Sequence, residues 1–163
     1  LTPVGEVQVE DYPVYRAATV TDVDVDGDGM GPMFMTLFRH IKDNDIAMTA
    51  PVDMGYARSE EPRMSSMAFL YRRADMGTPG ADGAVRVEDL APRTFASVGV
   101  RGDYTTEHYR EGLAILEQWL AVTSAWRADG TPRYLGHNGP FVPTFWRYGE
   151  VQVPVVPVDP DAG

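Results

Sequence analysis

Residues 22–33, DVDVDGDGMGPM, are the stretch whose residue types most directly suggest chemistry, because closely spaced carboxylates can bind Ca²⁺. The run D-x-D-x-D-G matches the start of an EF-hand calcium loop as far as Gly27. The twelfth position, where an EF-hand has a bidentate glutamate, is Met33, and residues 13–21 have the composition of a strand rather than a helix. The sequence therefore favours a solvated acidic turn, with a calcium site as the alternative.

Other side chains that enzymes use for catalysis are sparse along the chain. Cysteine is absent, which excludes disulfides, thiolate nucleophiles and Cys-based metal sites. Neither the G-x-S-x-G motif of serine hydrolases nor the H-E-x-x-H motif of zinc peptidases occurs. Of the three histidines, His108 falls in the first turn of a predicted helix, where we expect it to be solvated. These observations predict a protein that is not an enzyme.

The charge balance narrows the classes of partner. The 24 acidic and 14 basic residues give a net charge of −10 at pH 7. Nucleic acids and anionic membranes attract basic surfaces, so this balance argues against both. No apolar run approaches the roughly 18 residues of a membrane-spanning helix. A small molecule remains as the partner, and we expect a soluble monomer that is either cytoplasmic or exported after loss of an N-terminal signal.

Periodic patterns place the secondary structure within a single domain, predicted at 1–156, and leave a tail at 157–163 that we expect to be disordered. Apolar residues spaced by three and four predict one helix at 30–43 and another at 105–127. Alternating and β-rich segments predict strands, at 5–11, 14–25, 46–54, 64–73, 84–88, 93–101, 133–138 and 146–155.

The order strand, helix, strand, strand occurs twice, over residues 13–73 and 93–155. Two helices are too few for an alternating parallel-sheet fold, in which a helix usually connects successive strands. We therefore predict an α+β fold made of duplicated β-α-β-β units, with one curved, mostly antiparallel sheet and two helices packed against it.

Two segments carry a more specific signal, namely FMTLFRHIKDNDIAMTAPVDM at 34–54 and YLGHNGPFVPTFWRYGEVQVPV at 134–155. The first contains Met-Thr-Ala-Pro-Val directly after a helix and an asparagine loop, and the second contains Arg147, Glu150 and Val151 in a closing motif. Together they resemble the SOUL haem-binding family, and the likeness extends in order over nearly the whole chain. The resemblance implies a distorted, mostly antiparallel β-barrel flanked by two α-helices, an architecture also found in GyrI-like effector-binding domains.

The resemblance also implies a ligand and its site. Haem or another planar tetrapyrrole would bind in a shallow apolar groove between the first helix and the 138–145 loop. The matching residues are Phe34, Leu37, Phe38 and Arg39 on the helix and Phe141, Val142 and Phe145 on the loop. Phe34 and Leu37 also suit the core-facing side of an amphipathic helix, so core packing remains the alternative for these two.

Haem iron would need an axial ligand. The hairpin histidine of some family members corresponds to Asp11, so that ligand is absent here. His40 and His137 stand where the family tends to have tyrosine, and the resemblance puts them at opposite walls of the groove. Each is a candidate iron ligand, and the alternative is a half-buried histidine bonded to the backbone.

Two other functions stay open. The scaffold suits a GyrI-like domain that binds or sequesters a small molecule without haem. It also suits a small hydrolase in which Glu150, which resembles an inward-facing family residue, acts as acid or base. The loss of the hairpin histidine favours the first of these over a tightly ligated haem protein.

Overall fold

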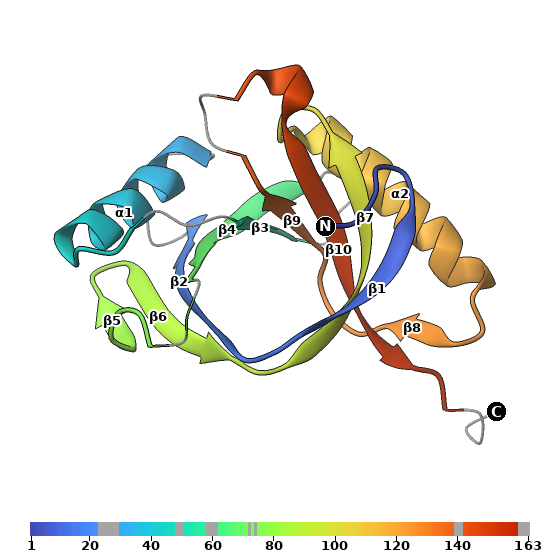
Figure 1. Cartoon of the computed structure of the whole chain (residues 1–163), viewed down its shortest axis with the longest axis horizontal. Helices are drawn as coiled ribbons and strands as arrows, with labels where there is room; N and C mark the ends of the chain where they lie inside the picture. Colours follow the sequence, from blue (N-terminus) through green and yellow to red (C-terminus); the bar gives the residue numbers. More distant parts are fainter. Residues whose placement is uncertain are drawn as a thin grey trace.

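One antiparallel sheet of ten strands forms the frame of the molecule, and the two helices lie on its outer, convex side (Figure 1). The structure is a computed structural model that describes residues 1–22, 30–47, 51–57, 62–71, 73, 75–138 and 142–159. The predicted acidic turn falls almost entirely outside the described residues, as do most of the Met-Thr-Ala-Pro-Val motif and the end of the predicted tail. Among the described residues, no cluster of acidic or histidine side chains could hold a metal ion.

The elements follow the predicted order. The first unit comprises β2 (Tyr15–Thr21), α1 (Met30–Asp43), β3 (Val52–Ala57) and β4 (Arg63–Leu70), and it is preceded by β1 (Val7–Tyr12). A hairpin of β5 (Gly80–Asp82) and β6 (Val85–Leu90) follows. The second unit comprises β7 (Arg93–Arg101), α2 (Thr106–Val122), β8 (Trp126–Ala128), β9 (Arg133–Gly136), the 3-10 turn η2 (Thr144–Trp146) and β10 (Tyr148–Pro157).

Strand pairing confirms the duplication. In the first unit β4 lies between β2 and β3, and in the second β10 lies between β7 and β9. The two units join where β3 pairs with β9, and the order is β1-β7-β10-β9-β3-β4-β2-β6-β5, with β8 paired to the end of β10 off this path. β1 and β5 are at opposite ends of this order, so the sheet curls without closing and the expected barrel is open.

The alternation of side chains gives the sheet two different faces. On β10, Val151, Val153 and Val155 join the large core beneath the helices, whereas Glu150 and Gln152 point to the concave side. α1 contributes Met33, Leu37 and Ile41 to the core, and α2 contributes Tyr109 and Leu116. A smaller apolar cluster lies on the concave face around Leu70 and Leu135.

The predicted and observed elements differ where pairing partners lie far apart in the sequence. The helix predicted at 30–43 is found at those residues. α2 ends at Val122 rather than at 127, because Trp126–Ala128 instead pairs with the end of β10. The short strand β5 at Gly80–Asp82 lies outside the predicted strands. At the C-terminus, Pro157 belongs to β10 and the Val158 amide donates to the Ala125 carbonyl. No helix among the described residues is long and apolar enough to cross a membrane.

Tyr134 offers a test of the core packing. Its hydroxyl is buried without a hydrogen-bond partner among the described residues, which is costly for a polar group. We expect Tyr134→Phe to raise the free energy of unfolding by about 1 kcal/mol in urea denaturation. The matched control is Tyr104→Phe, which removes a hydroxyl that donates to the Tyr148 carbonyl and accepts from the Asn138 amide. This substitution should lower the free energy of unfolding by a similar amount. Destabilisation by both changes would contradict this account.

Candidate functional site

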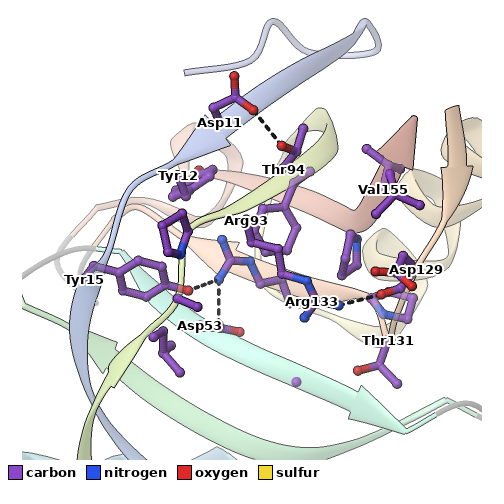
Figure 2. A pocket seen from close by; sticks show the side chains of 18 of the residues that line it. Asp11, Tyr12, Tyr15, Asp53, Arg93, Thr94, Asp129, Thr131, Arg133 and Val155 are labelled. Atoms are coloured by element: carbon purple, nitrogen blue, oxygen red, sulfur yellow. Dashed lines mark hydrogen bonds and ion pairs between the residues drawn. The ribbon is translucent and has the colours of Figure 1, made fainter. Parts of the chain in front are cut away.

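The concave face of the sheet contains a cavity of about 860 Å³, a size in the range of small-molecule sites. It lies between the ends of β1, β3, β7, β9 and β10 (Figure 2). Its apolar lining includes Phe95, Leu90, Pro92, Pro154 and Val155. Five charged side chains also line it: Asp11, Asp53, Arg93, Asp129 and Arg133.

Arg133 lies in the wall of this cavity and is 6% exposed. Its Nη1 donates to the Tyr15 hydroxyl at 2.8 Å and to Asp53 at 3.1 Å, as the dashed lines in Figure 2 indicate. Its Nε donates to Gln152 at 2.9 Å, and its guanidinium stacks on the Phe95 ring at 3.9 Å from the ring centroid. Four strands therefore fix one cation.

The Arg133–Asp53 ion pair is shielded from water. Burial raises the pKa of the Asp53 carboxyl, and the nearby Arg133 charge opposes that rise. The Arg133 guanidinium stays protonated, since the pKa of this group is raised by Asp53 and its other neighbours against the effect of burial. The pair therefore adds polarity to the cavity but no net charge while both groups are ionised.

A second polar cluster surrounds Glu150 on the same face. The Thr2 amide and hydroxyl and the Ser97 hydroxyl all donate to its Oε2, at 3.2, 2.6 and 2.9 Å. His137 Nε2 lies 2.7 Å from its Oε1, close enough for an ion pair, although the ring is not oriented for a good hydrogen bond. The carboxylate is only 1% exposed, so these contacts replace its hydration.

The environment of Glu150 determines its ionisation. Burial raises the pKa of the carboxyl group, but the contacts with His137, Thr2 and Ser97 outweigh burial and lower the pKa to about 2. Glu150 is therefore ionised across the physiological range. A carboxylate with so low a pKa is a weak base, and at neutral pH it carries no proton to donate.

The residues predicted on α1 divide between the core and the surface. Leu37 is completely buried, so it packs in the core and cannot contact a ligand in a surface groove. Phe34 is half-buried against Phe69, and its ring stacks with that of Phe38, with centroids 6.1 Å apart and planes at 13°. Phe38 is 38% exposed, and Arg39 is exposed beside it.

The structure does not bring the two predicted iron ligands together. His40 is buried, and its Nδ1 lies 2.7 Å from the Asp82 carboxylate on β5. At 100° per residue, His40 lies about 160° around the helix axis from Phe38, on the far side of the buried arc. His137 instead pairs with Glu150 and lines a separate cavity of about 560 Å³ beside Leu1–Val4. No cavity in the described part of the chain is lined by both histidines.

The 138–145 loop is described only in part. Phe141 lies outside the described residues. Val142 is half-buried, and its carbonyl accepts a hydrogen bond from Arg147. Phe145 is 65% exposed and contacts the ring of Trp146, which is also exposed. Phe145 and Trp146 therefore form an exposed aromatic pair at the end of this loop, and Phe34 and Phe38 form a partly exposed pair on α1.

None of the eight predicted site residues that the structure describes lines the large concave cavity. The residues that do, above all Arg133 and Asp53, carry no motif. A signal was nevertheless present, since Glu150 and Gln152 alternate with valines in the segment EVQV and so mark a polar face on β10. Alternation alone does not tell whether such a face is solvated or encloses a site.

Comparisons with known proteins agree with this fold. The model of the SOUL heme-binding protein family matches residues 3–154. No match was found among curated proteins. The C-terminal domain of EcmrR is similar in structure, with a TM-score of 0.68 and 15% identity over 94% of this chain and 98% of that one.

Two further structures show the same fold at low identity. A protein described as a hydrolase from Listeria innocua has a TM-score of 0.61 and 11% identity, over 95% of this chain and 94% of that one. SAV2435, solved with bound tetraphenylphosphonium, has a TM-score of 0.55 and 11% identity, over 93% of this chain and 94% of its own. The family match covers nearly the whole length, and the chain therefore belongs to the SOUL heme-binding family.

Proposed function

We propose that the chain binds haem or a related tetrapyrrole without enzymatic turnover, on the side of α1 that carries Phe34 and Phe38. The observation that carries the proposal is this stacked and partly exposed aromatic pair, in a family whose members bind heme. A porphyrin is a flat apolar disc, and an exposed phenyl ring offers it a stacking surface. Arg39 follows Phe38 on the helix and is exposed, and it would bond a propionate at the edge of the disc.

The proposed contact is apolar rather than a bond to iron from either candidate histidine. His40 is buried, and it lies on the other side of the helix axis from Phe38. Ligation by His137 would take that side chain from Glu150. Exposed Phe145 is a further contact if the ligand spans from α1 to the 138–145 loop, as the resemblance implies.

Titration with metal-free protoporphyrin IX and with haemin tests this proposal. We expect saturable absorbance changes for both compounds at micromolar concentration, with dissociation constants within a few-fold of each other. Phe38→Ala should weaken the binding of both compounds by about five-fold, which corresponds to the loss of one aromatic stacking contact. His40→Ala and His137→Ala should leave the haemin Soret band unshifted.

The control is Val122→Ala, which trims a more exposed apolar residue on the other helix. Two results would refute the proposal: no saturable change with either porphyrin, or unaltered affinity in the Phe38→Ala protein. If haemin bound but protoporphyrin did not, and the Soret band shifted in a histidine variant, then iron ligation and not apolar contact would explain the binding.

Binding of a different small molecule on the concave face is the second candidate function. The 860 Å³ cavity with its buried ion pair favours it, and SAV2435 has the same fold and binds an aromatic ion. A hydrolase with Glu150 as general acid is a weaker candidate, since the pKa of about 2 leaves no proton to donate at neutral pH.

A further inference from the structure

The guanidinium of Arg133 is incompletely bonded. Nε and Nη1 donate to Gln152, Tyr15 and Asp53, but Nη2 is buried without a hydrogen-bond partner among the described residues. Buried donors are nearly always paired, because an unpaired one has lost water without compensation. The side chain lines the concave cavity, so an acceptor group of a bound molecule is a natural partner.

The surroundings of Arg133 indicate what else such a molecule must have. The walls around it are aromatic and apolar, with Phe95 under the guanidinium and Tyr12 at 5.1 Å from it. Asp11 and Asp129 also line the cavity, where the Asp11 carboxylate accepts from the Thr94 hydroxyl and the Asp129 carbonyl accepts from Arg93 (Figure 2). These two exposed carboxylates would repel a ligand that carries several negative charges.

We propose that the concave cavity binds a planar aromatic monocarboxylate, whose carboxylate accepts a hydrogen bond from Nη2 of Arg133. Charge-assisted bonds from arginine to carboxylate are stronger than bonds to a neutral carbonyl, so the acid is preferred over its amide. The inference rests on the second candidate function above and names its ligand class. It is independent of porphyrin binding, because the porphyrin is proposed to bind at α1. A porphyrin also differs from this ligand class, since it carries two propionates and a much larger disc.

Calorimetric titration of the full chain with three probes tests the inference: 1-naphthoate, 1-naphthamide and tetraphenylphosphonium. We expect saturable binding of 1-naphthoate, at least ten-fold tighter than that of the neutral amide. The double variant Arg133→Met/Asp53→Leu removes the ion pair without leaving a lone buried charge, and it should lose at least ten-fold in naphthoate affinity. The matched control Arg86→Gln removes an exposed cation of β6 that does not line this cavity, and it should change affinity less than three-fold.

The outcomes separate this inference from the function on which it rests. Equal binding of acid and amide overturns the carboxylate preference, as does undiminished naphthoate binding by the folded double variant. Binding of tetraphenylphosphonium without naphthoate overturns the inference but keeps a small-molecule site, and binding of no probe refutes both. If circular dichroism shows that the double variant is unfolded, NMR of the wild-type protein provides the test. Naphthoate should then shift the Arg133 Nε–Hε resonance, and an unshifted resonance overturns the inference.

Discussion

Replacing Glu150 with glutamine is expected to lower the free energy of unfolding by about 3 kcal/mol at pH 7. The carboxylate is buried and held by Thr2, Ser97 and His137, and most of those contacts depend on its negative charge. A glutamine places an amide against at least one donor and leaves His137 without its partner. Urea denaturation of both proteins measures the difference.

The effect should depend on pH in a defined direction. The folded pKa of Glu150 is about 2, below the usual 4.5, so its stabilisation is complete above pH 4.5 and is lost as the pH falls towards 2. The shift corresponds to about 3 kcal/mol, of which about 2 kcal/mol is gone at pH 3. The stability gap between the wild type and Glu150→Gln should therefore narrow by about 2 kcal/mol between pH 7 and pH 3.

Glu88→Gln is the matched control, because this acid also lies on the concave side but is exposed. It should change stability by less than about 0.5 kcal/mol at either pH. A gap between wild type and Glu150→Gln that stays constant from pH 7 to pH 3 would show that the buried contacts do not select the ionised form of Glu150.

The helices and the duplication could be predicted from the sequence because both depend on local patterns. The spacing of Met33, Leu37 and Ile41 gives the apolar side of α1, and Asn44-Asp45 gives its end. The end of α2 could not be placed in this way, because it depends on Trp126–Ala128 pairing with residues about 30 positions later. Local helix signals do not report such competition.

The cavity could not be predicted for a related reason. Arg133 and Asp53 are 80 residues apart and meet only because β3 pairs with β9, the contact that joins the two units. The sequence indicates that each occupies one face of a strand, but not that the sheet curls to place that face around a cavity. Likewise, the family resemblance predicts that His40 and His137 border one groove, whereas their partners Asp82 and Glu150 hold them at different sites.

The Arg133–Asp53 pair leads to the largest expected loss of stability from a single substitution. Arg133→Met leaves the Asp53 carboxylate in a poorly hydrated site without its counter-ion, and removing one partner of such a pair costs about 4 kcal/mol. Tyr15 and Gln152 also lose a donor. Thermal and urea unfolding should both register the loss, whereas Arg93→Met, at a more exposed position in the same cavity, should cost under about 1 kcal/mol.

A second substitution and a change of pH can distinguish two causes of this destabilisation, namely the unpaired charge of Asp53 and the lost packing of Arg133. Adding Asp53→Leu removes the stranded charge, so the double variant should recover at least half of the lost stability. Burial already raises the pKa of Asp53, and without Arg133 the pKa rises further, so the carboxyl group protonates at a higher pH in the folded variant than in the unfolded chain. The gap between wild type and Arg133→Met should therefore narrow as the pH falls from 7 to 5. A double variant no more stable than Arg133→Met, with a pH-independent gap, would mean that Arg133 stabilises the sheet through its stacking on Phe95 and not by neutralising Asp53.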